Sequence, residues 1–204
     1  MKKMSALILA LALCAAPAFA EAAPQPSPEA AFAPTDSTIL VACFSATGNT
    51  WPLAEYAAEF LNADLFRIEP EIPYTEADLN YGDSASRANQ EMNDETSRPA
   101  LKATVENIEQ YDTILLGFPI WWGQAPRLIE TFVEAHDLSG KTILPFCTSG
   151  SSGYGQTGEI LAVLTDETVT WLEGRRFPAS ATAEEIAAWL QEMAIEPYAP
   201  SEEE

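Results

Sequence analysis

This sequence of 204 residues has little cysteine and almost no histidine. His136 is the only histidine, and cysteine occurs only at Cys14, Cys43 and Cys147. Cys43 and Cys147 fall at the ends of predicted strands, and no Cys or His residues are paired at metal-ligand spacing. We therefore expect small buried thiols rather than a disulfide framework or a metal site. Catalysis by a histidine-activated nucleophile has little support either.

Basic residues are scarce as well. Ten Lys and Arg stand against 31 Asp and Glu, which gives a formal net charge of −21 at pH 7. Such a balance argues against nucleic acid or an anionic membrane as a partner. It is consistent with steering toward a basic partner surface and equally with the plain solubility of an exported domain.

The beginning of the chain has the pattern of a secretory signal peptide over residues 1–20. Lys2 and Lys3 form a basic start, Met4–Ala16 is apolar apart from one serine, and Ala18–Ala20 is an A-x-A cleavage site. The apolar run is too short to cross a bilayer comfortably. We therefore expect a bacterial protein exported to the periplasm or the medium, with no stable membrane span after removal of the signal peptide.

Cys14 raises the alternative of a lipoprotein leader, but Leu13 before it is bulky where lipoprotein peptidases take a small residue. Cleavage after Ala20 is favoured because the A-x-A signal is intact. That cleavage removes two basic residues and no acid, so the net charge of −21 becomes −23 in the mature chain.

Composition divides the rest of the chain into three parts. Residues 21–37 are rich in Ala and Pro and predict a flexible or polyproline-like linker. Residues 38–195 have the length and patterning of one globular domain. Residues 196–204 end in three glutamates and predict an acidic disordered tail.

Strand and helix patterns alternate along the domain. The predicted strands are 38–44, 64–69, 113–118, 142–147 and 168–172. The predicted helices are 49–61, 84–91, 101–109, 126–135, 156–164 and 183–193, the last with Thr182 as its N-cap. Between the second and third strands, residues 70–99 form a long polar segment that should pack as a partly helical excursion.

This order predicts an α/β three-layer sandwich, in which a five-stranded parallel sheet carries helices on both faces. In such sheets, ligands bind at the carboxyl ends of the strands, where the strand order reverses. The loops that follow the first, third and fourth predicted strands should therefore converge on one edge of the sheet.

The first of these loops is Ser45-Ala46-Thr47-Gly48-Asn49-Thr50. Small hydroxyl and amide residues around one glycine, between a buried strand and a helix, are typical of a phosphate-binding loop, because backbone N–H groups at a helix start attract anions. The loop contains no Lys or Arg, no Gly-Lys-Ser/Thr ending and no dinucleotide glycine spacing. A terminal phosphate monoester fits it best, and an ordinary strand-to-helix turn is the alternative.

The other two loops suit a flat aromatic group. Pro119–Gly123 contains Trp121 and Trp122, whose large surfaces can stack on a ring, although one could be core and the other an exposed contact. The segment Thr148–Gly155 is rich in Gly and Ser, which would let backbone approach a heterocycle closely, or could be a flexible turn. Tyr154 could stack on or border the same ring.

With these motifs the chain resembles the flavodoxin family. The resemblance rests on Phe44–Thr50 (Phe-Ser-x-Thr-Gly-Asn-Thr), Gly117–Gly123 (Gly-x-Pro-Ile-Trp-Trp-Gly) and Pro145–Gly153 (Pro-Phe-Cys-Thr-Ser-Gly-x-Ser-Gly), and it covers nearly the whole domain. It implies a flavodoxin-like fold that binds FMN noncovalently. By the family pattern the phosphate would be held by Ser45, Thr47, Gly48, Asn49 and Thr50. Pro119, Ile120, Trp121, Trp122 and Gly123 would flank the isoalloxazine, and Thr148, Ser149, Gly150, Ser151, Ser152 and Gly153 would close its other side.

The resemblance implies electron transfer by the bound flavin to a redox partner protein or a small-molecule donor or acceptor. One alternative is an FMN-dependent NAD(P)H:quinone or small-molecule oxidoreductase, with a nicotinamide pocket built from Tyr154, His136, Arg127 and residues 70–99. Another is a flavin-free binding module on the same fold. The loop around the phosphate lacks Lys and Arg, and the mature chain is strongly acidic. This negative field disfavours adding charge to the flavin, so we also expect a low potential for reduction of bound FMN to its anionic hydroquinone.

Overall fold

The computed structural model describes residues 37–199. Within that range one sheet has six strands, in the order β2-β1-β3-β4-β5 with β6 also paired to β4. Every pairing between these strands is parallel. The strands are β1 (Ile39–Cys43), β2 (Asp64–Arg67), β3 (Thr113–Pro119), β4 (Thr142–Thr148), β5 (Thr170–Trp171) and β6 (Arg175–Phe177). The predicted α/β fold with a parallel sheet is confirmed.

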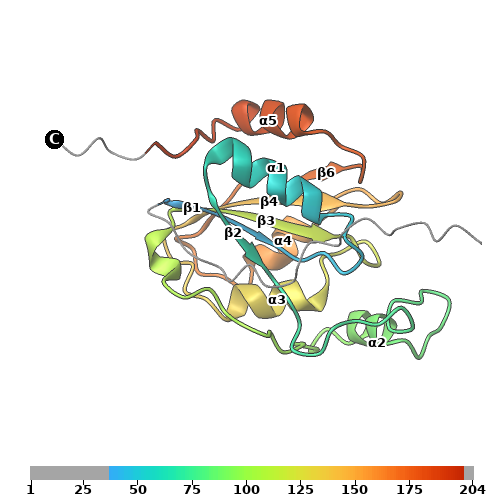
Figure 1. Ribbon diagram of the computed structural model, residues 1–204. Helices are drawn as coiled ribbons and strands as arrows, with labels where there is room; N and C mark the ends of the chain where they lie inside the picture. Colours follow the sequence, from blue (N-terminus) through green and yellow to red (C-terminus); the bar gives the residue numbers. More distant parts are fainter. Residues whose placement is uncertain (1–36, 200–204) are drawn as a thin grey trace, which may run out of the picture. The chain divides into compact units, whose positions relative to one another are not determined.

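Helices cover both faces of the sheet (Figure 1). The helices are α1 (Trp51–Leu61), α2 (Arg87–Asn93), α3 (Arg127–Glu134), α4 (Thr157–Ala162) and α5 (Ala183–Glu192), with a short 3₁₀ helix at Ile108–Gln110. Helices α1 and α5 lie on one face, and α3 and α4 lie on the other. As predicted, Thr182 is the N-cap of α5, in a capping box with Glu185.

The apolar run of β1 fills the core on both sides of the sheet. Leu40 and Ala42 belong to a hydrophobic cluster with α3 and α4, whereas Val41 and Cys43 belong to a second cluster with α1 and α5. All five residues of this strand are buried. A continuous apolar run is what a strand covered on both faces requires, because neighbouring side chains point to opposite faces.

The last strand position is divided between β5 and β6. Both pair with β4, β5 at its start and β6 at its carboxyl end. The sequence predicts one strand at 168–172 and misses β6. Gly174 lies in the break, and a Cβ there would come within 2.3 Å of the Tyr154 ring. The ring of Tyr154 therefore occupies the space that a side chain at position 174 would need.

The polar segment 70–99 leaves and rejoins the domain at one place. Pro70 and Leu101 form an antiparallel bridge, and the N–H of Glu71 donates to the carbonyl of Ala100 at 2.8 Å. Helix α2, predicted at 84–91, is observed at Arg87–Asn93 with Ser86 as its N-cap. It stands away from the sheet (Figure 1).

The helix predicted at 101–109 is not formed, apart from the 3₁₀ turn at its end. The backbone N–H of Lys102 donates to the carbonyl of Glu69, and that of Val105 donates to His136 Nε2, both at 2.9 Å. Because these two N–H groups form hydrogen bonds with other segments of the chain, they are not available for hydrogen bonds within a helix.

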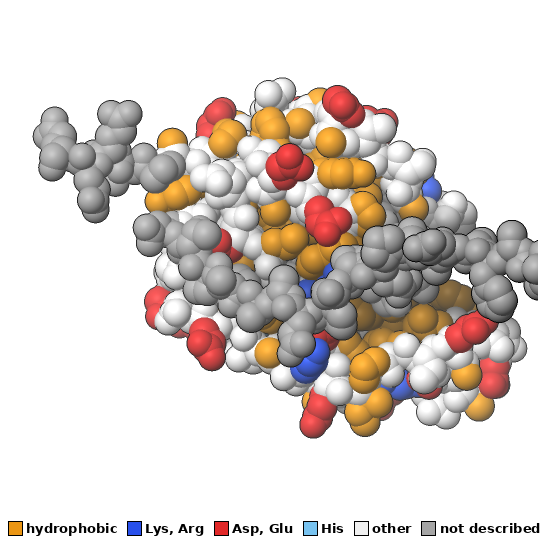
Figure 2. All heavy atoms as spheres, in the orientation of Figure 1, with side chains coloured by type: hydrophobic (Ala, Val, Ile, Leu, Met, Phe, Trp, Pro, Cys, Tyr) orange, Lys and Arg blue, Asp and Glu red, His pale blue; other side chains and the backbone are white. Residues whose placement is uncertain are grey.

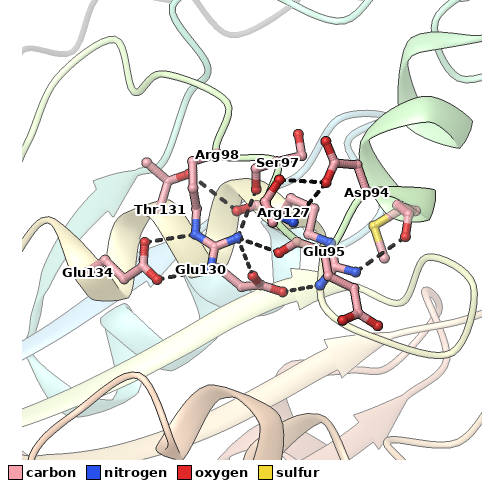
Figure 3. Close-up of polar contacts among 10 residues, drawn as sticks. Asp94, Glu95, Ser97, Arg98, Arg127, Glu130, Thr131 and Glu134 are labelled. Carbon is pink, nitrogen blue, oxygen red and sulfur yellow. Dashed lines mark hydrogen bonds and ion pairs between the residues drawn. The ribbon is translucent and has the colours of Figure 1, made fainter.

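A network of ion pairs attaches the end of the 70–99 segment to α3 (Figure 3). Glu130, which is 4% exposed, pairs with both Arg127 and Arg98. Arg98 also pairs with Glu134 at 2.7 Å, and Arg127 donates to the carbonyl of Met92 at 3.2 Å. Arg98 and Arg127 thus bind two parts of the chain to the same buried carboxylate.

The ends of the described range lie against the domain. Ser37, which falls at the end of the predicted linker, is buried and accepts from the N–H of Ile39. In the predicted disordered tail, the N–H of Tyr198 donates to the carbonyl of Leu61, the last residue of α1, at 2.8 Å. The predicted signal peptide, the rest of the linker and residues 200–204 lie outside the described residues.

Candidate functional site

The three loops singled out in the sequence meet at the carboxyl ends of β1, β3 and β4. They surround a cavity of about 470 Å³, here called the first cavity, whose size is typical of a small-molecule site. Eight of the predicted site residues line it: Thr47, Asn49, Pro119, Ile120, Trp121, Thr148, Ser149 and Gly150. The structure thus brings residues of all three predicted loops together around one space.

The first loop is fixed by Ser45 and Thr50. Ser45 Oγ accepts hydrogen bonds from the N–H groups of Thr50 and Trp51, at 3.0 and 3.3 Å, and so satisfies donors at the start of α1. Thr50 is buried, and its Oγ1 lies 2.8 Å from Oγ1 of Thr148 on the third loop. These two residues, predicted to hold a phosphate, hold the loop itself in place.

Between them, Thr47, Gly48 and Asn49 are exposed. Within residues 37–199, the backbone N–H groups of these three residues have no hydrogen-bond partner. Gly48 has a φ of +82°, a conformation that glycine adopts without strain. Free N–H groups in a tight loop before a helix form a site suited to an anion. This observation fits the predicted phosphate.

Trp121 forms both core and cavity wall. It is 4% exposed and makes edge contacts with Phe44 and Tyr74, with ring centroids 5.6 and 5.2 Å apart. Phe44 precedes the first loop, and Tyr74 belongs to the 70–99 segment. Trp121 therefore presents only a small part of its ring to the first cavity, beside Pro119 and Ile120.

Trp122 points elsewhere. Its φ is +49°, and its ring lies 4.4 Å from that of Tyr81, with both side chains exposed. Neither Trp122 nor Gly123 lines the first cavity, whereas Tyr81 does. The two tryptophans are thus separated: Trp121 borders the first cavity, and Trp122 packs on the residue that forms part of its rim.

The third loop contributes only its beginning. Thr148, Ser149 and Gly150 line the first cavity, and the next three residues are exposed outside its wall: Ser151, Ser152 and Gly153. Tyr154 is directed into the domain, with its ring against Gly158 and Gly174. Its hydroxyl is buried and, among the described residues, has no hydrogen-bond partner.

Six residues of the wall were not predicted: Ala46, Leu79, Tyr81, Arg176, Pro178 and Ala179. Leu79 and Tyr81 come from the 70–99 segment, whose polar composition carries no periodic signal. Arg176 comes from β6, and its guanidinium donates to the carbonyl of Ser149 at 2.6 Å. Arg176 could have been predicted at this site from the strand order only if the sequence had indicated a strand at β6.

A second cavity of about 990 Å³ adjoins the first. The two share Ala46, Thr47, Leu79 and Tyr81, and the second extends along the 70–99 segment past Glu76. Figure 2 shows hydrophobic side chains gathered between the body of the domain and the part of this segment around α2. The segment therefore forms a wall of both cavities.

His136 and Arg127 do not line either cavity. The Nδ1 atom of His136 lies 2.7 Å from the carbonyl oxygen of Phe132, and its Nε2 atom accepts a hydrogen bond from the backbone N–H of Val105. Burial lowers the pKa of His136 below its ordinary value. Arg127 is buried in the ion-pair network with Glu130. Both residues have structural contacts that account for them.

The wall of the first cavity contains no carboxylate, thiol or imidazole among the described residues. Burial raises the pKa of the nearby Cys147 thiol to about 12, so this thiol stays protonated at neutral pH. The described residues contain no group of His, Cys, Asp and Glu that could hold a metal ion. None of the helices in this range is long and apolar enough to span a membrane.

These features define a doubly wound α/β domain with an anion-binding loop and an aromatic wall at the carboxyl edge of its sheet. The family model for flavodoxin matches residues 38–193, and the chain belongs to this family. The chain is thus a flavodoxin-like flavoprotein, and the family supports FMN, the cofactor predicted from the sequence.

Two similar structures are proteins assigned as flavoproteins. That from Bacteroides eggerthii is 45% identical, covers 78% of this chain and 98% of its own, and has a TM-score of 0.72. That from Bacteroides uniformis is 43% identical, covers 75% and 97%, and has a TM-score of 0.71. A Lactobacillus acidophilus flavoprotein in complex with FMN is 18% identical over 68% of this chain and 91% of its own; with a TM-score of 0.55 it shows a shared fold. No functionally curated protein matches the chain.

Proposed function

We propose that this protein is an exported electron carrier that binds FMN noncovalently in the first cavity. The observation that carries the proposal is that, among the described residues, the backbone N–H groups of Thr47, Gly48 and Asn49 have no partner and lie beside a cavity with an aromatic wall. The first loop would hold the phosphate of FMN, and Trp121 and the Thr148–Gly150 backbone would border its ring. Bound FMN supplies the capacity to accept and release electrons.

The side chains around the first cavity suit a carrier. Electron transfer needs no protein acid or base, and none of the carboxylates, thiols or the imidazole of the described residues lines this cavity. Trp121 is buried, and Thr50 and Thr148 are hydrogen-bonded to each other; both features would limit rearrangement of the wall when bound FMN changes redox state.

The first test is whether the purified full chain carries FMN. We expect a yellow protein with the visible absorbance of oxidised flavin, and release of FMN, not riboflavin, on denaturation. Its reduced form should pass electrons to a one-electron acceptor protein. A colourless protein that takes up no added FMN would contradict this proposal and support a flavin-free binding module.

The second cavity favours one alternative, an FMN-dependent NAD(P)H:quinone or small-molecule oxidoreductase. Its volume of about 990 Å³ leaves room for a substrate beside the first cavity. Steady-state oxidation of NADH or NADPH with a quinone would identify this activity. Stoichiometric flavin reduction without turnover, in the presence of both nucleotides and several quinones, would leave the carrier as the function.

Export is the part of the proposal that rests on the sequence of the leader. Expression of the full chain in a bacterium should yield a periplasmic or extracellular protein whose first residue is Glu21. Cell fractionation and mass spectrometry of the intact product measure both. A cytoplasmic product that retains residues 1–20 would contradict it.

A further inference from the structure

The cationic side chains of this acidic chain are nearly all used in internal contacts. Of the ten Lys and Arg, Lys2 and Lys3 precede the described residues, which leaves eight. Five of these form ion pairs with carboxylates: Arg87, Arg98, Lys102, Arg127 and Arg175. Lys141 is buried and donates to the carbonyl of Tyr111, and Arg67 lies over the Trp51 ring, 3.5 Å from its centroid.

Arg176 is the eighth, and it differs from the others. It is exposed, it lines the first cavity, and within residues 37–199 it forms no ion pair. Its guanidinium donates to the carbonyl of Ser149, a neutral partner that leaves its positive charge uncompensated. No other Lys or Arg of the described residues lines either cavity.

The strand order places Arg176 at the ring side of the first cavity rather than at the phosphate loop. Arg176 is paired with Cys147 of β4, directly before the loop that begins at Thr148. Between β6 and β1, which leads into the phosphate loop, lie β4 and β3. Three interstrand spacings amount to roughly 14 Å. The charge of Arg176 is therefore attached to the third loop, which the family pattern places beside the isoalloxazine.

We propose that Arg176 sets the reduction potential of the bound flavin by stabilising the negative charge that its ring gains on reduction. A chemical reductant such as dithionite supplies two electrons and the solvent supplies one proton, so the ring becomes more negative by one charge. No bond of the protein forms or breaks. A cation held beside the ring favours that added charge, and the effect is larger in a partly dehydrated site. This inference rests on the proposed binding of FMN.

The proposed effect of Arg176 opposes the low reduction potential that the sequence predicts for bound FMN. The absence of Lys and Arg from the first loop and the acidity of the chain predict a field that disfavours reduction. Arg176 places a positive charge where the reduction takes place, and the net charge acts from farther away through solvent that screens it. The local charge therefore offsets part of that field at the ring.

Arg176→Gln removes the charge at an exposed position and keeps hydrogen-bond donors for Ser149. In the FMN-loaded full chain, the variant's affinity for reduced FMN should fall about tenfold more than its affinity for oxidised FMN. A tenfold difference between the two states corresponds to a midpoint about 30 mV lower for a two-electron couple. A dithionite titration against a reference dye measures the midpoint, and quenching of FMN fluorescence measures binding of the oxidised form.

Two variants serve as controls. Arg176→Lys keeps the positive charge, so its midpoint potential should stay close to that of the wild type. Arg175→Gln removes the neighbouring cation, which pairs with Glu192 at 2.8 Å and does not line the first cavity. It should leave the midpoint unchanged. Thermal unfolding of each variant shows whether the fold is retained.

The outcomes separate this inference from the proposed function. If Arg176→Gln leaves the midpoint unchanged, the inference is overturned, whatever happens to stability. It is also overturned if oxidised and reduced FMN lose affinity equally and riboflavin loses none, because Arg176 would then act on the phosphate. A wild-type protein that takes up no FMN overturns the proposed function first, and this inference with it.

Discussion

The residues of the first loop divide into those that hold the loop and those that are free to bind. Ser45 and Thr50 are engaged in hydrogen bonds with α1 and the third loop, whereas Thr47, Gly48 and Asn49 have unpaired N–H groups within the described range. The family pattern assigns all five to the phosphate. In the structure, Ser45 and Thr50 hold the backbone of this loop in position.

Replacement of Gly48 tests this loop directly. Gly48→Ala forces a left-handed conformation on alanine, at a cost of about 1–2 kcal/mol, although nothing lies within 4 Å of the added Cβ. We expect FMN to bind roughly tenfold more weakly, as measured by fluorescence quenching. Gly140→Ala is the control, because Gly140 has a φ of +72° and an equally open surrounding but lies before the amino end of β4, at the sheet edge opposite the first loop. Equal losses of FMN affinity in both variants would contradict the assignment.

Tyr154 was predicted to border the flavin, but the structure packs its ring into the domain. Its buried hydroxyl has no partner in the described residues, so Tyr154→Phe removes a desolvated polar group without opening a cavity. We expect the free energy of unfolding to rise by about 1 kcal/mol in urea titrations. FMN affinity should not change. A loss of flavin affinity in this variant would place the hydroxyl at the cofactor after all.

His136 makes stability depend on pH. Burial keeps its folded pKa below the ordinary value of 6.5, and protonation of Nε2 would break the hydrogen bond from Val105. The unfolded chain therefore binds the proton first as pH falls. The contribution of His136 to stability is present above pH 6.5 and is lost as pH falls through the lower folded value. Urea unfolding across this range should show a smaller decrease for His136→Gln than for the wild type.

At the scale of elements, the ion pairs of Figure 3 hold the 70–99 segment on α3. Glu130→Gln leaves Arg127 buried without its carboxylate, and we expect a loss of about 3 kcal/mol in the free energy of unfolding. Glu134→Gln is the matched control. It removes another carboxylate of Arg98, but Glu134 has a 37% exposed side chain and should contribute less than about 1 kcal/mol. Similar losses in the two variants would show that burial does not govern this network.

The elements that could be predicted are those whose apolar composition indicates that they are buried. The apolar run of β1 is covered on both faces, so its strand and the loop that follows were evident. Strand β6 is short and begins with Arg175 and Arg176, and such a segment has no apolar pattern. Its position depends on pairing with β4, which local sequence does not specify.

The same reasoning explains what was missed at the candidate site. The walls from the 70–99 segment depend on contacts such as that of Tyr74 with Trp121, between residues far apart in the chain. The helix expected at 101–109 gave way to hydrogen bonds with Glu69 and His136. Hydrophobic periodicity identifies helices and strands that have one side facing the core. It does not predict the position of a polar segment that is held by individual contacts with distant residues.

The whole molecule is strongly acidic, and acidic side chains are scattered over the face shown in Figure 2, where basic ones are few. With a formal charge of −21, the protein should attract cationic partners over long distances. We expect electron transfer from the reduced protein to hexaammineruthenium(III) to slow about tenfold between low and high salt. Transfer to ferricyanide should accelerate. Stopped-flow rates measure both, and rates independent of salt would contradict a role for net charge.

The bridge between Pro70 and Leu101 has a consequence for how such a protein can change. Because the 70–99 segment begins and ends at adjacent points, its interior can be lengthened, shortened or exchanged without altering the spacing of β2 and β3. The loops that converge on the first cavity belong to the sheet and would stay as they are. Both cavities would change with each exchange, the first of them at Leu79 and Tyr81. Evolution, or an engineer, can therefore vary what approaches the flavin while the three sheet loops that border it are inherited intact.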